Sequence, residues 1–110
     1  MWKNVPAGEY FGLGMAGDSD SGDYGPTYYE LERDYIDKNG YILHRDGVTP
    51  YLYNEENGDF ISFDDCLSVS AKADFAKKTG LGGLMYWEHS CDTEKTLIRA
   101  LGLRINAVKR

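Results

Sequence analysis

The first third of the chain shows two short patterns of hydrophobic residues. Apolar and polar residues alternate over 9–15, which predicts a short strand inside a glycine-rich stretch. Apolar residues then recur at helical spacing over 26–37, and Pro26 stands where a proline favours the first turn of a helix. Asn39-Gly40 is predicted to end this helix.

In the middle of the chain, hydrophobic residues recur at every second position, which predicts three strands joined by turns. The predicted strands are Tyr41–Arg45, Val48–Tyr53 and Phe60–Phe63. Pro50 has no backbone N–H to donate, so its strand is expected at an edge of the sheet or at a bulge.

Helical spacing returns after the third strand. The helix is predicted to begin at Asp64 or Asp65, either of which can cap it, and to end at Gly80. Its buried face is expected to comprise Leu67, Ala71, Phe75 and Ala76.

The remaining pattern predicts one strand and one helix. The apolar run over 82–87 shows no alternation, which is typical of a parallel strand buried on both faces. The last helix is expected to be capped by Asp92 and to close near Gly102.

This order of elements predicts an α+β protein with two domains. Residues 1–63 are expected to form an antiparallel sheet with one helix, and residues 64–110 a helix-strand-helix unit. Because one buried strand cannot form a parallel sheet alone, the second domain is expected to be a piece of a larger fold.

The composition argues against two classes of function. A net charge of −6 is unfavourable for nucleic-acid binding, which needs clustered lysines and arginines. No apolar run approaches the roughly 18 residues that cross a bilayer. The first residues lack the apolar stretch of a secretory signal, so an exported parent would carry its signal outside this chain.

The cysteines and aromatic residues narrow the candidate chemistry. Cys66 and Cys91 are expected to be free thiols, although a disulfide between them stays open. Neither His44 nor His89 has a partner at metal-ligand spacing, so no metal or cofactor is expected. Aromatic residues make up 14% of the chain. Most should pack in the core, and two or three are expected to stack on sugar rings.

Four segments carry a family resemblance. Asp59–Asp65 reads DFISFDD, Gly80–Glu88 reads GLGGLMYWE, Trp2–Val5 reads WKNV and Tyr28–Glu30 reads YYE. Together they resemble the C-terminal part of glycoside hydrolase family 18, the chitinase family. The chain departs from the family pattern in 89–92, which reads HSCD in place of the more typical LSGD.

The resemblance implies a specific place within a larger enzyme. Members of the family are (β/α)8 TIM barrels with an insertion domain after the seventh strand. Residues 1–63 would then be this chitinase insertion domain, and 64–110 the last helix-strand-helix of the barrel. The family's Asp-x-x-Asp-x-Asp-x-Glu motif, which holds the catalytic acid, does not occur in the 110 residues. No catalytic residue is therefore expected, and the chain alone should be inactive.

The resemblance also nominates sugar-binding residues. Family members use the substrate's own N-acetyl group as nucleophile, over a hydrophobic floor that holds the sugar. Trp87 would be this floor, with core packing as its alternative. Met85 could line the same pocket or pack in the core. Glu30 would accept hydrogen bonds from sugar hydroxyls, or be a solvated helix carboxylate. Trp2 would form part of the cleft wall.

Three functional hypotheses follow. In the first, the chain is a C-terminal fragment of an extracellular or cell-surface hydrolase of β-1,4-linked N-acetylglucosamine polymers such as chitin. In the second, it is a non-catalytic, lectin-like carbohydrate-binding module of the same family. In the third, it is a freestanding domain whose resemblance records ancestry alone. Self-association through the uncovered strand over 82–87 is also expected.

Overall fold

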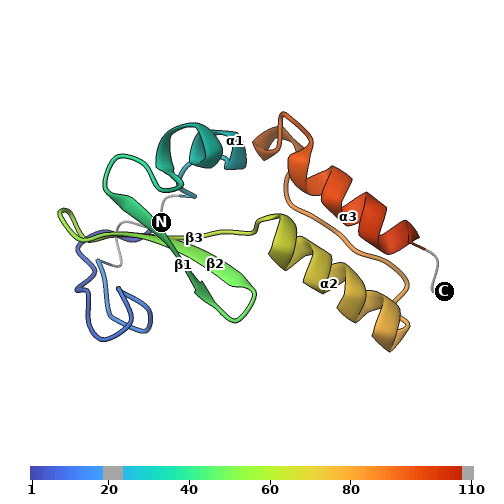
Figure 1. The fold of residues 1–110 in the computed structure, drawn as a ribbon, viewed down its shortest axis with the longest axis horizontal. Helices are drawn as coiled ribbons and strands as arrows, with labels where there is room; N and C mark the ends of the chain where they lie inside the picture. Colours follow the sequence, from blue (N-terminus) through green and yellow to red (C-terminus); the bar gives the residue numbers. More distant parts are fainter. Residues whose placement is uncertain (19–23, 108–110) are drawn as a thin grey trace. The chain divides into compact units, whose positions relative to one another are not determined.

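A computed structural model describes residues 1–18 and 24–107. The chain divides into two compact units, Met1–Phe63 and Asp64–Arg110. The first unit combines an antiparallel sheet with a short helix, and the second contains the two longer helices (Figure 1). The mixed α+β fold class predicted from the sequence is confirmed.

The helix of the first unit is shorter than the sequence suggested. It consists of α1 (Tyr28–Glu30) followed by a π-helical turn, η2 (Leu31–Tyr35). Thr27 caps it, so Pro26 precedes the cap and is not the first helical residue. The Ile36 N–H donates to the Leu31 carbonyl at 2.8 Å, which is the i→i+5 bond of a π-helix.

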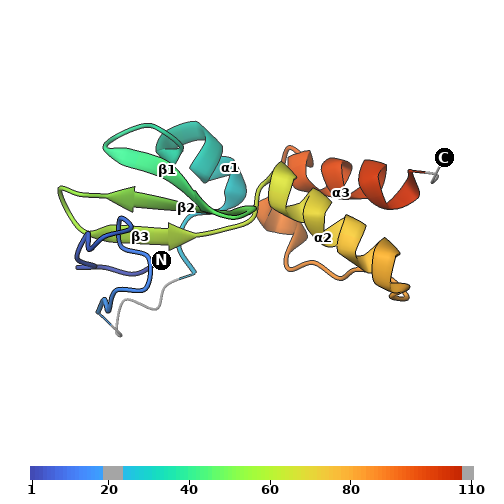
Figure 2. The ribbon, with the colours of Figure 1, turned by 60° about the horizontal axis from the view of Figure 1, so that its bottom comes forward.

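The three predicted strands are present with small shifts at their ends. They are β1 (Tyr41–Asp46), β2 (Thr49–Asn54) and β3 (Asp59–Ser62), paired antiparallel in the order β1-β2-β3 (Figure 2). Leu52 lies opposite Leu43 and Ile61 in the register, so these side chains share one face of the sheet. Leu31 packs on this face, and with Tyr41, Leu52 and Ile61 it forms the buried core.

The strand that contains Pro50 was expected at an edge of the sheet or at a bulge. This was wrong, because β2 is the central strand. Pro50 pairs with Arg45 of β1, whereas the pairing with β3 begins only at Tyr51. The strand therefore has a single neighbour at Pro50, and the absent N–H leaves no gap in the β2–β3 ladder. The outer edge of β3 is covered instead: Trp2 and Phe60 exchange backbone hydrogen bonds of 2.8 and 2.9 Å.

The strand predicted over 9–15 was also wrong. Residues 8–14 form consecutive turns, with hydrogen bonds from Leu13 N–H to the Tyr10 carbonyl and from Met15 N–H to the Gly12 carbonyl. Phe11 and Gly12 have φ angles of 49° and 86°. Residues in the left-handed conformation change the direction of the backbone, so the segment 9–15 cannot form an extended strand despite its alternating pattern.

The second unit contains the expected helices. Helix α2 (Cys66–Thr79) begins with a capping box between Asp65 and Ser68, and Gly80 ends it in the left-handed conformation. Helix α3 (Thr96–Asn106) is longer than predicted, because it continues through Gly102.

Asp92 caps α3 from a distance. Its carboxylate accepts hydrogen bonds from the N–H groups of Thr96 and Ile98, both at 2.9 Å. Asp92 itself is buried. The predicted capping role of Asp92 is confirmed, although Lys95 is the residue at the boundary of the helix.

The expected buried face of α2 is confirmed at Ala76 and wrong at Leu67 and Phe75. Ser68, Ala73 and Ala76 are buried, whereas Leu67 and Phe75 are 51% and 61% exposed. Helices α2 and α3 pack against each other. The small residues of α2 are buried, and the two large apolar residues are exposed to solvent.

The strand expected over 82–87 does not form. The whole segment 81–90 is exposed and has no ladder partner among residues 1–18 and 24–107. A strand needs a neighbour to receive its backbone hydrogen bonds, and the described residues provide none. The segment ends in a 3-10 turn, η3 (His89–Cys91), and both cysteines are free.

Candidate functional site

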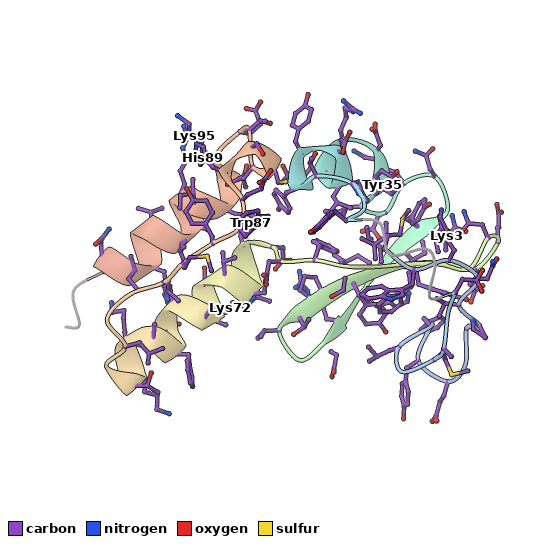
Figure 3. All side chains as sticks on the ribbon, turned by 180° about the vertical axis from the view of Figure 1, so that it is seen from behind. Lys3, Tyr35, Lys72, Trp87, His89 and Lys95 are labelled. Atoms are coloured by element: carbon purple, nitrogen blue, oxygen red, sulfur yellow. The ribbon has the colours of Figure 1, made fainter. Side chains whose placement is uncertain are left out.

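The segment that connects α2 to α3 carries the most exposed of the proposed sugar-binding residues. Trp87 is 83% exposed and Met85 is 84% exposed. Figure 3 shows Trp87 on this connecting segment, near the labelled His89. Within residues 1–18 and 24–107, the Trp87 indole stacks on no other ring. An indole exposed to this extent can stack on a flat apolar ligand.

Short-range contacts fix the chain on both sides of Trp87. Before it, the Leu81 N–H donates to the Ala76 carbonyl at 3.0 Å. After it, the Tyr86 hydroxyl lies 3.0 Å from His89 Nδ1, and the Ser90 hydroxyl donates to the Glu88 carboxylate. The peptide bond between Trp87 and Glu88 is cis. These contacts involve the neighbours of Trp87, whereas the Trp87 side chain itself remains exposed to solvent.

Glu30 takes part in a helix cap. Its Oε2 accepts hydrogen bonds from the Thr27 N–H at 2.8 Å and from the Thr27 hydroxyl at 3.0 Å. The backbone bond, followed by the hydroxyl bond, lowers the pKa of the Glu30 carboxyl from 4.5. The two hydrogen bonds from Thr27 therefore fix the orientation of the Glu30 carboxylate. Its contact with sugar stays a prediction.

Trp2 lies beside the sheet rather than free in solvent. It is 45% exposed, and its ring meets Phe60 edge to face at 5.9 Å between centroids. Because its backbone is paired to β3, the indole is held against the edge of the sheet. Part of the Trp2 ring packs against Phe60, and the rest is exposed to solvent. Its place in a cleft wall stays a prediction.

The four candidates fall into two groups. Trp87 and Met85 belong to one segment of the second unit, and Glu30 and Trp2 lie on different elements of the first. Each is at least partly accessible, and none is in the described hydrophobic core.

An aromatic row that the sequence did not reveal crosses the sheet on the face opposite the core. Phe11 stacks on His44 at 4.4 Å between centroids, His44 on Tyr51 at 5.3 Å, and Tyr51 on Phe60 at 5.1 Å. Trp2 closes the row through Phe60. Period-two spacing predicts which strand residues share this face, but the turn that brings Phe11 to His44 has no such signal.

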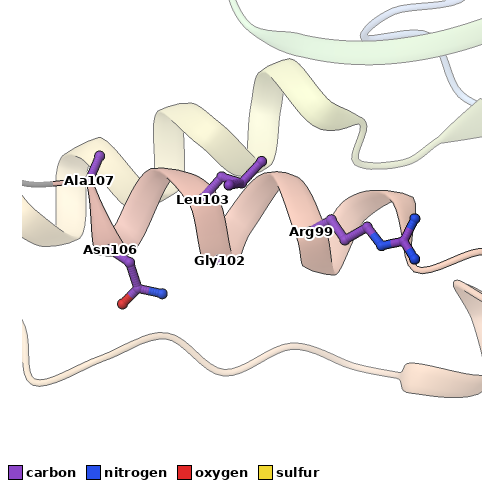
Figure 4. A pocket seen from close by; sticks show the side chains of 5 residues that line it. All are labelled: Arg99, Gly102, Leu103, Asn106 and Ala107. Atoms are coloured by element: carbon purple, nitrogen blue, oxygen red, sulfur yellow. The ribbon is translucent and has the colours of Figure 1, made fainter.

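Helix α3 has a shallow, open depression on its surface. Figure 4 shows the residues that line it, which are Arg99, Gly102, Leu103, Asn106 and Ala107. Leu103 is 77% exposed, and Arg99 is the lining residue with a charge. The depression has no carboxylate or nucleophile among these residues.

Two negative findings apply to residues 1–18 and 24–107. No group of three or more histidine, cysteine, aspartate or glutamate residues there could hold a metal ion. No helix in that part is long and apolar enough to cross a bilayer.

Comparison with protein families gives a match over most of the chain. Residues 2–92 match the model described as glycosyl hydrolases family 18. Chitinase A1 of Niallia circulans is 50% identical over 72 residues, which cover 64% of this chain and 10% of that protein. Chitinase B of Serratia marcescens is 36% identical over 84 residues, which cover 74% of this chain and 17% of that protein.

Solved structures agree with the sequence matches. Chitinase ChiW from Paenibacillus sp. str. FPU-7 has a TM-score of 0.85 at 36% identity, covering 98% of this chain and 13% of that one. A family 18 N-acetylglucosaminidase from Paenibacillus barengoltzii has a TM-score of 0.74 at 37% identity, covering 91% and 29%. The chain thus spans a minor part of each of these relatives.

Proposed function

Since the chain belongs to the family 18 glycosyl hydrolases, we propose that it contributes sugar-stacking and cleft-wall residues to a chitinase. The substrate would be a β-1,4-linked polymer of N-acetylglucosamine. The observation that carries this proposal is the match over residues 2–92, which includes the Gly80–Glu88 segment with its exposed tryptophan.

In this proposal, Trp87 forms the hydrophobic floor on which the sugar ring rests. Its indole is large, flat and 83% exposed, so it can stack on the apolar face of a pyranose. Met85, two residues earlier and 84% exposed, would line the same pocket. Glu30 would accept a hydrogen bond from a sugar hydroxyl, and Trp2 would form part of the cleft wall.

The two units would then belong to different parts of the larger enzyme. Met1–Phe63 would be the insertion domain, and Asp64–Arg110 the last helix-strand-helix of the barrel. The exposed run over 82–87 would become a strand when barrel neighbours supply its hydrogen bonds. The parent would be extracellular or on the cell surface.

The chain by itself would be inactive. Substrate-assisted hydrolysis needs a protonated carboxylic acid beside the glycosidic oxygen, and the Asp-x-x-Asp-x-Asp-x-Glu motif is absent from the sequence. Incubation with chitotetraose, followed by chromatography of the products, should show no cleavage. Release of shorter oligosaccharides would contradict this division of roles.

A non-catalytic, lectin-like carbohydrate-binding module of the same family is the second candidate function. The coding sequence upstream of Met1 separates the two candidates. A continuous frame that encodes the acid motif supports the hydrolase. A continuous frame with the barrel strands but no acid in that motif supports the lectin-like module.

Self-association is the remaining part of the proposal. Leu84, Met85 and Trp87 are exposed on one segment, and uncovered apolar segments with free backbone groups pair with other chains. Sedimentation velocity across a wide concentration range should show a dimer or larger species. A strictly monomeric chain at all concentrations would contradict this part.

A further inference from the structure

The turn segment over 8–15 displays two aromatic side chains to solvent. Tyr10 is 59% exposed and Phe11 is 44% exposed. One face of the Phe11 ring lies on His44, at 4.4 Å and 13° between the ring planes. The opposite face stacks on no ring of residues 1–18 and 24–107. The turn therefore carries two consecutive aromatic residues that are both partly exposed to solvent.

The backbone holds Phe11 in a conformation that bulky residues rarely adopt. Its φ angle is 49°, in the left-handed region that an aromatic residue occupies only when its surroundings impose it. Gly12 follows at φ 86° and is packed so closely that a Cβ there would lie 2.9 Å from the Tyr53 ring. The turn thus has little freedom to present Phe11 differently.

Contacts with the sheet make the display rigid. The Tyr51 hydroxyl donates to the Tyr10 carbonyl at 2.8 Å, across 41 positions of the sequence. His44, on which Phe11 rests, is itself stacked on Tyr51. A ring that is already ordered loses little conformational entropy when it binds a ligand.

The size of this surface favours a small flat ligand over a protein. At these exposed fractions, Tyr10, Phe11 and the 44% exposed Met15 offer roughly 300 Å² of surface. A stable protein interface buries about 800 Å² on each partner. One or two pyranose rings match the smaller of these areas. The exposed Glu9 carboxylate, next to Tyr10 in sequence, can accept hydrogen bonds from their hydroxyl groups.

We propose that Tyr10 and Phe11 form an additional stacking site for β-1,4-linked N-acetylglucosamine chains. The ligand class rests on the proposed function of the chain. In this site, the open face of Phe11 stacks on a pyranose ring, Tyr10 extends the aromatic surface, and the sheet behind the turn fixes both.

The test is a titration of the 15N-labelled 110-residue chain with chitotetraose, followed by NMR. Amide signals of 10–12 and the Trp87 indole signal report the two sites independently. Both sets are expected to shift. Phe11→Tyr should keep the response of the turn, because it keeps a flat ring. Phe11→Leu should weaken it roughly three- to tenfold while leaving the Trp87 response unchanged. Val48→Ala, at a similarly exposed apolar residue of the same unit, is the matched control and should change nothing.

Three results would overturn the inference. If the Trp87 signal alone shifts, the additional site is absent and the proposed function stands. If neither signal shifts, the sugar-binding function fails together with the site. If Phe11→Leu binds as tightly as the wild type, the contact at the turn is not aromatic stacking.

Discussion

Thr27 directs two donors at one oxygen of Glu30. The Thr27 N–H and hydroxyl lie 2.8 and 3.0 Å from Glu30 Oε2, and the Glu30 N–H returns a bond to Thr27 Oγ1 at 3.3 Å. This reciprocal pair begins α1. It also orients the carboxylate that we propose to contact sugar, so one side chain serves both the helix cap and the site.

The Thr27–Glu30 pair predicts a specific response to acid. Because the folded-state pKa of Glu30 is lowered from 4.5, its contribution to stability is present above about pH 4.5 and is lost as the pH falls through the lowered value. Wild type should unfold at a higher temperature than Glu30→Gln at pH 7. The difference should narrow below pH 4.5. A difference that stays constant from pH 7 to pH 3 would contradict this role of the carboxylate.

Tyr41 predicts a response at alkaline pH. Burial, followed by its 2.6 Å hydrogen bond to Asp59, raises the pKa of Tyr41 from 10.0 to about 12. Its contribution to stability is complete below pH 10 and is lost as the pH rises towards 12. Absorbance titration at alkaline pH should show one fewer late-titrating tyrosine in Tyr41→Phe than in the wild type, because burial raises the pKa values of Tyr51 and Tyr53 as well. If both proteins titrate alike, the Tyr41–Asp59 bond is not maintained in solution.

The core of the first unit predicts a large difference between two leucines. Leu52 is fully buried and Leu103 is 77% exposed. Leu52→Ala should destabilise the protein by about 2–5 kcal/mol, since it leaves a cavity under the helix. Leu103→Ala should change stability by less than about 0.5 kcal/mol. Urea unfolding measures both, and equal effects would mean that the central strand is not packed as described.

Asp92 predicts a stability effect in the second unit. Its carboxylate satisfies two N–H groups at the start of α3, so Asp92→Ala should cost about 1–3 kcal/mol. Asp74→Ala is the matched control, because it removes a solvent-exposed ion pair with Arg104, which is expected to contribute little to stability. Helical circular dichroism during thermal unfolding gives the comparison. Asp92→Ala with no larger effect than the control would contradict the capping role.

The sequence predicted those elements whose information is local. The β1, β2 and β3 strands follow from period-two spacing, and the ends of α2 follow from the Asp65 cap and the left-handed Gly80. These features depend on neighbouring residues, so a pattern along the chain is enough to find them.

The failed expectations depend on partners distant in sequence. The apolar run over 82–87 has the composition of a buried strand, yet a strand exists only where another strand accepts its hydrogen bonds. Leu67 and Phe75 follow helical spacing, yet both are exposed while Ala73 is buried. The stack of Phe11 on His44 joins a turn to a strand. No period along the chain encodes such a contact.

The proposed function depends above all on the binding of chitotetraose by Trp87. The chain has two tryptophans, so Trp2→Phe leaves Trp87 as the sole indole fluorophore and Trp87→Phe leaves Trp2. Because Trp87 is 83% exposed, Trp87→Ala should leave the unfolding temperature nearly unchanged while reducing affinity. If Trp87 binds the sugar, chitotetraose should produce a saturable fluorescence change in Trp2→Phe and should bind more weakly to Trp87→Ala. A Trp87 signal that does not respond to the sugar, or equal affinity in Trp87→Ala, would contradict it.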